Sequence, residues 1–412
     1  MRYKLSAPSQ VKAVIELPAS KSISNRALIL HALAQGEGKL TNLSDCDDTQ
    51  VMIRALDGQP HEVIDILAAG TAMRFLTAYL SVTPGIRLLT GTQRMQQRPI
   101  RLLVDALRQL GAHIEYASNE GYPPLRINGT TLSGNHITLQ GSVSSQYISA
   151  LLMIGPMLEH GLKLDLSGDI ISQPYINLTL QLMQEFGASA RWTSEHSICV
   201  EPHPYRNISF TVESDWSGAS YWYQIAALAS DAEIRLQGLF EKSYQGDSRG
   251  AEIFALLGVA TEFTPEGVLL RKTAARPERL DEDFVDIPDL AQTFVVTCVL
   301  LNIPFRFTGL QSLKIKETDR ICALITELRK LGYVLADEND SVLSWDGERC
   351  PAEATPVIQT YEDHRMAMAF APAALCIPDM RIAEPQVVSK SYPRYWSDLA
   401  KAGFDIETEA ED

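Results

Sequence analysis

The sequence predicts an α/β protein in which one structural unit is repeated six times. Two helix patterns recur in step along the chain, and short alternating stretches lie between them. The first pattern, as in LLVDALRQLG, has apolar residues at spacings of three and four and ends in glycine, which is typical of a helix C-cap. The glycines follow one another at gaps of 76, 71, 74 and 71 residues: Gly111, Gly187, Gly258, Gly332 and Gly403. A sixth, degenerate copy places Gly58 only 53 residues before Gly111.

The second pattern, as in SSQYISALLMIGPML, is apolar nearly all round, so these helices are expected to be buried. After its first gap it keeps the same period, with starts near Ser22, Gly70, Ser145, Ser217, Asp289 and Asp363. Two patterns at one period favour a true repeat over the loose self-similarity of many α/β proteins.

Alternating apolar and polar residues predict short strands around the helices, at 136–141, 162–168, 208–214, 233–239 and 268–273. Three units can close around three buried helices, so six units would form two similar domains. We expect one domain to comprise residues 1–19 and 215–412, and the other residues 20–214. If the buried helices of a domain run parallel, their N-termini emerge on one side, where backbone N–H groups favour anions.

The composition excludes several classes of protein. Hydrophobic residues make up 45% of the 412 residues and charged residues 21%, as in a globular chain rather than a disordered one. A formal net charge of −15 argues against a general nucleic-acid binder, which usually presents a basic face. The six cysteines show no zinc-ligand spacing, so we expect reduced thiols and no metal site. The sequence shows no signal peptide or membrane span, and we expect a cytoplasmic protein.

The first buried helix opens with PASKSISNR, which places Lys21 and Arg26 beside backbone N–H groups. Cations at a helix N-terminus oppose the helix dipole, so an anionic ligand explains them better than a structural role does. The third helix opens with Ser144, Ser145 and Gln146, which offer neutral donors. Ordinary N-capping is the simpler reading of that triplet.

The second buried helix begins at Gly70, where the backbone allows close approach of a ligand. Four arginines follow in GTAMR and TGTQRMQQRPIR, and their guanidinium groups suit bidentate contacts with carboxylate or phosphate: Arg74, Arg94, Arg98 and Arg101. A solvated charged surface is the alternative for any one of them.

The second half of the chain contributes KIKETDR and YEDHRMAM. On a helix, Lys316 and Arg320 would share a face, and such a like-charge pair costs free energy unless an anion bridges it. A salt-bridge network with Glu317 is the alternative. Asp363 could simply cap the helix that follows it, and His364 alone is more often structural than catalytic.

Nine segments, in order, resemble the motifs of the EPSP synthase (3-phosphoshikimate 1-carboxyvinyltransferase) family of enolpyruvyl transferases. They are PASKSISNRAL, LAAGTAMRFL, QRMQQRPI, GSVSSQYISALL, ISQPYINLTL, IPDLAQT, KIKETDRI, YEDHRMAM and VVSKSYPRYW. The resemblance runs from Lys21 to about Trp396, and the combination is far more specific than any single motif. It implies two inside-out α/β domains, each of three β-α-β-α-β-β units with parallel helices buried and sheets outside.

The resemblance also implies an activity. The family transfers the enolpyruvyl group of phosphoenolpyruvate to the 5-hydroxyl of shikimate 3-phosphate, giving 5-enolpyruvylshikimate 3-phosphate and phosphate. This reaction serves the shikimate route to chorismate and the aromatic amino acids. The expected partners are these two small molecules, with no cofactor, no metal, no nucleic acid and no membrane, and we expect a monomer.

Site residues follow from matching motif positions. The resemblance implies shikimate 3-phosphate ligands at Lys21, Ser22, Arg26, Ser144, Ser145, Gln146, Ser172, Asp289 and Lys316. It implies phosphoenolpyruvate ligands at Lys21, Gly70, Arg94, Gln146, Arg320, Arg365 and Lys390. Asp289 is the expected base for the 5-hydroxyl proton and Glu317 the expected acid for the enol methylene, a role that Lys21 could share. The plain structural role of Asp289 is an N-cap.

Three departures from the family pattern stand out. Ala68 and Ser312 occupy positions where the family usually has Asn. Only 22 positions separate Asp48 from Gly70, so the first unit is short. Because loop-length changes cost little free energy, the loss of a piece of about twenty residues is expected to leave the neighbouring buried helices intact.

Two alternatives remain at this point. UDP-N-acetylglucosamine enolpyruvyl transferase has the same fold, but that family typically has Lys-Asn where this chain has Lys21-Ser22, and it uses a loop cysteine that QRMQQRPI lacks. The other alternative is a non-catalytic anion-binding relative, against which the retention of Asp289 and Glu317 argues.

Overall fold

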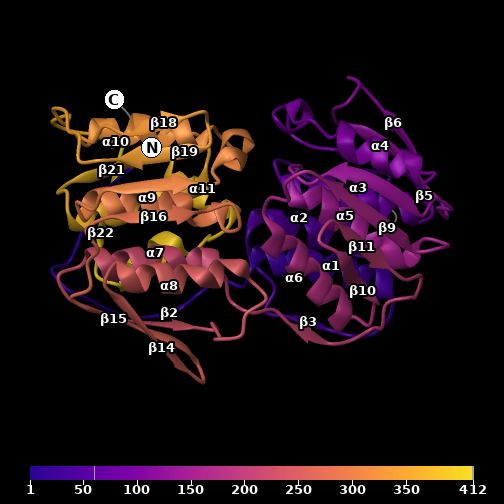
Figure 1. The fold of residues 1–412 in the computed structure, drawn as a ribbon, viewed down its shortest axis with the longest axis horizontal. Helices are drawn as coiled ribbons and strands as arrows, with labels where there is room; N and C mark the ends of the chain where they lie inside the picture. Colours follow the sequence, from indigo (N-terminus) through magenta and orange to yellow (C-terminus); the bar gives the residue numbers. More distant parts are fainter. Residues whose placement is uncertain (60, 411–412) are drawn as a thin grey trace. The chain divides into compact units, whose positions relative to one another are not determined.

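The computed structural model describes residues 1–59 and 61–410, and the chain divides into two compact units. Residues 1–18, together with the chain from Glu213 onward, form what we call the discontinuous domain, and residues 19–212 form the inserted domain. In Figure 1 the discontinuous domain is drawn mainly in orange and yellow, and the inserted domain in purple and magenta. The divisions lie one and two residues before the boundaries expected from the sequence.

Three mutually packed helices form the centre of the inserted domain: α1 (Lys21–Ala34), α3 (Gly70–Val82) and α5 (Ser145–Ile154). Almost every position of α5 is buried, as its all-round apolar pattern predicted. The N-termini of α3 and α5 lie together, because the Nε2 of Gln146 donates to the Oγ1 of Thr71 at 3.1 Å. The observed starts of α1, α3 and α5 lie within one residue of those expected from the sequence.

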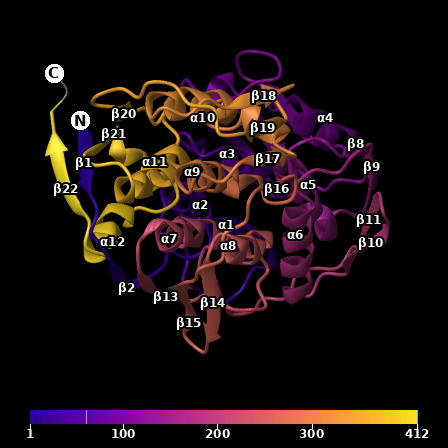
Figure 2. The ribbon, with the colours of Figure 1, turned by 60° about the vertical axis from the view of Figure 1, so that its left-hand side comes forward.

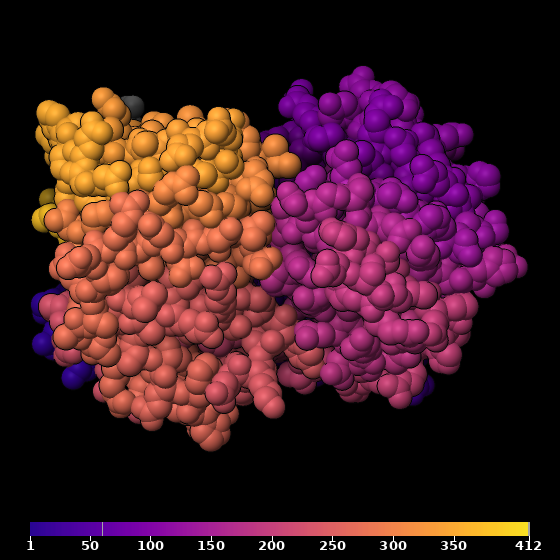
Figure 3. All heavy atoms as spheres, viewed as in Figure 1, coloured from indigo at the N-terminus to yellow at the C-terminus, as the bar shows by residue number. Residues whose placement is uncertain are grey.

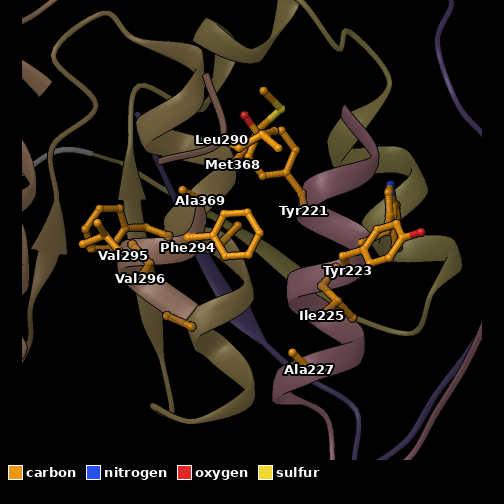
Figure 4. Close-up of a cluster of buried hydrophobic side chains, with 14 of the residues drawn as sticks. Tyr221, Tyr223, Ile225, Ala227, Leu290, Phe294, Val295, Val296, Met368 and Ala369 are labelled. Carbon is orange, nitrogen blue, oxygen red and sulfur yellow. The ribbon is translucent and has the colours of Figure 1, made fainter. Parts of the chain in front are cut away.

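The discontinuous domain has the same kind of centre, made by α7 (Trp216–Leu228), α9 (Ala291–Leu300) and α11 (His364–Phe370). Figure 4 shows Phe294 of α9 between these helices, in the cluster that holds Tyr221 and Met368. The Nε2 of Gln224 on α7 donates to the carbonyl oxygen of Ala369 on α11 at 3.0 Å, so this fully buried side chain links the two helices. Helix α9 begins two residues after the predicted start, because the chain first forms a short 3-10 turn at Asp289.

A second set of helices carries the glycine stops: α2 (Asp47–Ala55), α4 (Arg101–Gln109), α6 (Gln173–Glu185), α8 (Gly250–Leu256), α10 (Arg320–Lys330) and α12 (Tyr395–Lys401). The predicted glycines follow two residues after the helix end, or three in α2, and all six have positive φ between 80° and 103°. This left-handed conformation is strained for residues with a Cβ, which is why glycine recurs there. Short 3-10 helices also occur in the part of the chain that the structure describes: η1 (Met95–Gln97), η2 (Gly155–Met157), η3 (Gly246–Arg249), η4 (Pro288–Leu290), η5 (Gln311–Ile315), η6 (Ala371–Leu375) and η7 (Pro385–Lys390).

Within the described residues, five four-stranded sheets share one strand order, in which a parallel pair is followed by two antiparallel pairings. In the inserted domain they are β4–β5–β7–β6, from Val63–Asp65, Gly85–Thr90, Leu125–Gly129 and His113–Tyr116, and β8–β9–β11–β10, from His136–Gln140, Leu162–Ser167, Ser197–Val200 and Ala190–Ser194. In the discontinuous domain they are β2–β13–β15–β14, from Val11–Glu16, Ala232–Gln237, Gly267–Lys272 and Val259–Thr264; β16–β17–β19–β18, from Leu280–Asp283, Phe305–Thr308, Val342–Trp345 and Ala336–Glu338; and β20–β21–β1–β22, from Val357–Ile358, Met380–Ala383, Arg2–Ser6 and Asp405–Glu409. Each of these sheets belongs to a unit with one buried and one outer helix, so the β-α-β-α-β-β unit is confirmed for these five units.

The two ends of the chain meet in the discontinuous domain. Strand β1 pairs with both β21 and β22, with Arg2 opposite Ala383 and Glu409, and Figure 2 shows β1 and β22 side by side. Strand β2 runs parallel to β13. In the space-filling view, indigo atoms of the N-terminal residues border orange atoms of the same domain (Figure 3). A strand from each side of the inserted domain is therefore needed to complete a unit.

The first unit differs from the other five in its sheet. Strands β3 (Leu40–Thr41) and β12 (Phe210–Thr211) form a parallel pair and nothing more. Between α2 and β4 the described residues contain no strand, so the antiparallel hairpin of the other units is absent there. The short first unit inferred from the sequence thus lacks its hairpin while α1, α2 and α3 pack together.

Within the two described ranges, every helix is too short or too polar to cross a lipid bilayer.

Candidate active site

Three cations converge on the carboxylate of Asp289 in the discontinuous domain. The Nη2 of Arg365 donates to Oδ2 at 2.8 Å, while the Nη1 of Arg320 and the Nζ of Lys316 donate to Oδ1 at 3.3 and 3.4 Å. The carboxylate comes from η4, Arg320 and Arg365 come from the first turns of α10 and α11, and Lys316 comes from the segment before α10. The N-terminal ends of α9, α10 and α11 therefore meet at Asp289.

The charge balance at Asp289 keeps it ionised. Burial acts to raise the pKa of this carboxyl, but the charges of Arg365, Lys316 and Arg320 outweigh burial and hold the pKa well below its usual value. The side chain is 18% exposed, so it stands at the edge of the buried region. In this state Asp289 is a strong ion-pair partner and a weak base.

The capping role considered for Asp289 is wrong. The N-cap of α9 is Leu290, and no side chain caps that helix. Asp363, in contrast, does cap its helix, since it accepts from the backbone N–H of Arg365 at 2.9 Å. The same carboxylate also accepts two bonds from Arg320, at 2.7 and 3.3 Å. The sequence suggested only the cap.

Arg320 is the most buried cation of this cluster, with its side chain 1% exposed. Besides Asp289 and Asp363, it binds Glu317, whose Oε2 accepts from Nη2 at 2.8 Å. Lys316 does not share a helical face with Arg320 as the sequence suggested, because α10 begins at Arg320. The two cations instead meet on one oxygen of Asp289.

Lys390 lies in η7 and donates to the carbonyl oxygen of Glu362 at 2.7 Å. Glu362 directly precedes Asp363 in the chain. This contact brings Lys390 to the loop that leads into α11, which carries Arg365.

Most candidate residues of the inserted domain lie in the first turns of its buried helices, and Arg94 and Ser172 lie before η1 and α6. Lys21 forms a 2.6 Å ion pair with Asp48 of α2, which balances a cation that the helix dipole disfavours. Ser144 caps α5 by accepting from the backbone N–H of Gln146 at 3.4 Å, so the plain reading of that triplet holds for Ser144. Ser145 is buried in the first turn of α5.

Arg26 lies deeper than a surface ligand, at 2% exposure. It donates to the carbonyl oxygen of Ser22, to the Oγ of Ser149 and to the Oγ1 of Thr179, at distances of 2.7 to 3.0 Å. Burial lowers its pKa to about 10, which still leaves it charged at neutral pH. Two of these bonds join α1 to α5 and α6, and the third stays within α1.

Gly70 lies against two arginines. A Cβ at this position would approach the Nη1 of Arg98 to 2.6 Å and that of Arg74 to 2.9 Å. Arg94 is exposed before η1, and Ser172 is buried in a left-handed conformation with φ of 56° before α6. Ser172 makes no side-chain cap to α6, so its hydroxyl has a different orientation from an N-cap.

Sequence reasoning missed two partners. Asp48 is one, and its opposite charge to Lys21 was the available signal. Tyr221 is the other, and its hydroxyl accepts from the Nη1 of Arg365 at 3.4 Å. It stands four residues after the predicted helix start at Ser217, as Arg26 and Arg74 do after theirs, so alignment of the repeats would have found it.

No cluster of three or more potential metal ligands occurs among residues 1–59 and 61–410. The cations described above are instead suited to anionic groups.

Comparison with known proteins identifies the family. The sequence profile of EPSP synthase (3-phosphoshikimate 1-carboxyvinyltransferase) matches residues 5–59 and 57–399. A 3-phosphoshikimate 1-carboxyvinyltransferase of Bacteroides fragilis strain YCH46 is 74% identical over 407 residues, covering 99% of both chains. One from Photobacterium profundum is 37% identical over 424 residues, covering 96% of this chain and 98% of the relative.

Solved structures share the fold. The EPSP synthase of Acinetobacter baumannii superposes with a TM-score of 0.79 at 20% identity, over 99% of this chain and all of that chain. The enolpyruvyl transferase NikO of Streptomyces tendae gives a TM-score of 0.76 at 15% identity, over 98% of each chain.

Proposed function

The chain belongs to the EPSP synthase (3-phosphoshikimate 1-carboxyvinyltransferase) family, and we propose on that premise that it transfers the enolpyruvyl group of phosphoenolpyruvate to the 5-hydroxyl of shikimate 3-phosphate. The products are 5-enolpyruvylshikimate 3-phosphate and phosphate. The observation that carries the proposal within the structure is the group of three cations on Asp289, since two highly anionic substrates need converging positive charge.

Asp289 is the proposed base for the 5-hydroxyl proton. Its low pKa in the unliganded protein makes it a poor base, because Arg365, Lys316 and Arg320 stabilise the carboxylate. When phosphate and carboxylate groups of the substrates take up those cations, the pKa of Asp289 rises toward its usual value. Substrate binding would therefore activate the base at the moment when the hydroxyl is present.

Glu317 is the proposed acid for the enol methylene. The addition forms a bond between the 5-oxygen and C2 of phosphoenolpyruvate, while the methylene carbon takes a proton. Loss of phosphate, with a proton leaving the new methyl group, restores the double bond. The bond from Arg320 orients Glu317, and release of Arg320 to an anion would make its carboxyl easier to protonate. Lys21 is a second proposed proton donor.

Shikimate 3-phosphate is proposed to bind residues of both domains. In the inserted domain these are Lys21, Ser22, Arg26, Ser144, Ser145, Gln146 and Ser172, and in the discontinuous domain Asp289 and Lys316. The N-termini of α1 and α5 add backbone N–H groups that suit a phosphate. The ion pair of Lys21 with Asp48 would then loosen when the phosphate supplies the negative charge.

Phosphoenolpyruvate is proposed to bind Lys21, Gly70, Arg94, Gln146, Arg320, Arg365 and Lys390. The planar guanidinium groups suit its carboxylate and phosphate. Gly70 lets Arg98 and Arg74 lie closer to the backbone than any residue with a Cβ would allow. We also propose that the protein acts in the cytoplasm as a monomer.

A coupled phosphate-release assay tests the activity. We expect phosphate release only when both phosphoenolpyruvate and shikimate 3-phosphate are present. Release with UDP-N-acetylglucosamine in place of shikimate 3-phosphate would identify the other transferase, against which the family match argues. Saturable binding of shikimate 3-phosphate without any release would identify a non-catalytic relative. Analytical ultracentrifugation of the active protein tests the oligomeric state, and a monomer should sediment with the mass of one chain, 45.6 kDa.

A further inference from the structure

Two more carboxylates are buried behind the cation cluster and have no role in the proposed chemistry. Asp215 is the N-cap of α7 and accepts from the backbone N–H of Ser217 at 3.2 Å. Asp247 lies in η3, and its carboxylate accepts from the hydroxyl of the same Ser217. Asp215 is 8% exposed and Asp247 4% exposed. One serine therefore binds two buried acids, a costly arrangement if both are ionised.

The segment that carries Asp247 is held firmly against the start of α7. Glu213 accepts from the Oγ of Ser243 at 2.8 Å, and the Nε2 of Gln245 donates to the carbonyl oxygen of Ser214 at 2.7 Å. The backbone N–H of Trp216 donates to the Oε1 of Gln245 at 3.1 Å. Asp247 is thus fixed in place and cannot swing into water to relieve its burial.

The charged groups that act on Asp247 come from each neighbouring element. Asp215 of α7 and Asp289 of η4 are negative, and Arg365 of α11 is positive. Arg249 follows in the same short helix but pairs with Glu282 of β16 at 2.8 Å. Burial raises the pKa of Asp247 to about 7, helped by the charge of Asp289 and opposed by the Ser217 hydroxyl and Arg365. Burial likewise raises the pKa of Asp215 to about 6, so the two acids titrate as a pair.

Arg365 reaches the same helix as Ser217, because its Nη1 donates to the hydroxyl of Tyr221, one turn further along α7, at 3.4 Å. Its Nη2 donates to Asp289 at 2.8 Å, and its charge also acts on Asp215 and Asp247. We propose that Asp247 is a positioning residue of the anion site: it carries a proton while Arg365 serves the substrates, and its ionised form holds Arg365 back and repels the bound anion. The identity of that anion, shikimate 3-phosphate or phosphoenolpyruvate, rests on the proposed function; the titration of Asp247 does not.

The coupling works in both directions. A bound anion makes ionisation of Asp247 harder, and ionised Asp247 weakens anion binding by the same factor. If the anion raises the pKa of Asp247 by about one unit, the protonated form binds the anion roughly tenfold more tightly. Affinity should therefore be highest below neutral pH and fall as the pH rises through the pKa of the Asp215–Asp247 pair.

Asp247→Asn tests this directly, because Asn still accepts from Ser217 but cannot ionise. Binding of phosphoenolpyruvate, the proposed ligand of Arg365, is measured by calorimetry at pH 6.0 and pH 8.5 in both proteins, so that titration of the ligand cancels in the ratio. At pH 6.0 the two affinities should agree, and at pH 8.5 the variant should bind roughly tenfold more tightly than the parent. An equal ratio at both pH values would overturn the proposal.

Two further variants separate positioning from a structural role. Ser217→Ala removes a bond that lowers the pKa of Asp247, so the pH at which affinity falls should move upward. Glu213→Gln replaces a nearby, partly buried carboxyl with an amide whose oxygen can still accept from Ser243. The main influences on the pKa of Glu213 are burial and contacts with residues 243–245, so this variant should keep the pH profile of the parent. The positioning role of Asp247 is contradicted if Ser217→Ala does not change the pH at which affinity falls. It is also contradicted if Glu213→Gln abolishes the dependence of affinity on pH.

A readout without substrate keeps this inference apart from the proposed function. Carboxyl ¹³C NMR of aspartate-labelled protein should show a group that titrates near neutral pH and is lost in Asp247→Asn. If that signal is present but the enzyme releases no phosphate, the proposed function fails and the positioning role is judged on anion binding alone. If phosphate is released but no carboxyl titrates near neutrality, the inference fails.

Discussion

Asp289 is the residue whose replacement best separates chemistry from binding. Asp289→Asn should reduce turnover by roughly 10²–10⁴, the usual cost of losing a general base, while shikimate 3-phosphate still binds. Because the carboxylate binds three cations and caps no helix, the unliganded variant should also lose about 1–3 kcal/mol of unfolding free energy. Steady-state kinetics, calorimetry and urea unfolding measure the three quantities.

The matched control is Asp281→Asn on β16, since Asp281 pairs only with the exposed Arg279 among the contacts resolved here. An exposed pair of this kind contributes little to stability, so this variant should keep its turnover and nearly all of its stability. If Asp289→Asn turns over substrate at the parent rate, the base is another group, with Glu317 or Lys21 next in line.

The buried acids predict an unusual dependence of stability on pH. The pKa of Asp247 is about 7 and that of Asp215 about 6, both above the ordinary value near 3.8, so the folded state binds more protons than the unfolded state between about pH 4 and pH 7. Stability from these groups is complete below pH 4 and is lost as the pH rises, by at most about 1.4 kcal/mol per pH unit for each group. Asp289 has the opposite sign, since its pKa is lowered and its contribution is lost only in acid.

Urea unfolding of the unliganded protein at pH 5 and pH 8 measures this effect. Asp247→Asn should gain more stability relative to the parent at pH 8 than at pH 5, because the parent loses this contribution progressively as the pH rises. A gain that is the same at both pH values would show that the substitution improves packing and leaves proton binding unchanged.

At the scale of residues, the sequence predicted which side chains gather and not how they pair. Lys316, Arg320 and Arg365 were all expected at one site, and all three contact Asp289. The 3-10 turn at η4, which turns Asp289 away from α9 and toward these cations, leaves no periodic mark in the sequence. Pairs such as Lys21 with Asp48 depend on the packing of α1 against α2, which a pattern of spacings does not specify.

The glycine stops of the outer helices allow a test at the scale of elements. Gly111 and Gly258 both follow a helix with positive φ, at 103° and 88°. A Cβ at Gly111 would find its nearest neighbour at 4.0 Å, whereas at Gly258 it would approach the carbonyl oxygen of Ala275 to 2.8 Å. Gly111→Ala should therefore cost only the conformational strain, roughly 1–2 kcal/mol.

Gly258→Ala should cost more than Gly111→Ala, because the backbone around residue 275 must also move. Chemical unfolding of the two variants compares them directly. Equal losses would mean that the carbonyl at Ala275 shifts without cost, and that strain in φ alone explains why glycine recurs at these positions.

The elements themselves were largely predictable because the repeat supplied six chances to see each pattern. All six buried helices begin within two residues of the expected starts. The strands of the first unit were less predictable from the sequence. The stretch 208–214 was expected to form a strand, but only the two-residue strand β12 forms there. Its partner β3 is equally short and no hairpin extends the pair, so alternation in the sequence overstated the strand.

At the scale of the whole molecule, the chain passes between its two domains twice. The passages lie at 18–19 and 212–213, and the backbone N–H of Asp215 donates to the carbonyl oxygen of Pro18 at 2.9 Å. The two connecting segments are thus bound to each other at the edge of the discontinuous domain. A pair of adjacent connections is a suitable hinge for movement of one domain relative to the other.

Closure is the prediction that this organisation carries. The proposed ligands of shikimate 3-phosphate come from both domains, so full binding requires that the domains approach and assemble the site. Saturating shikimate 3-phosphate should therefore reduce the radius of gyration in small-angle X-ray scattering, whereas inorganic phosphate, which lacks the hydroxyl groups proposed to bind the discontinuous domain, should leave it unchanged. An unchanged radius at saturation shown by calorimetry would place all strong contacts within one domain. The cations of the other domain would then serve phosphoenolpyruvate alone, and addition of both substrates would be needed to bring the domains together.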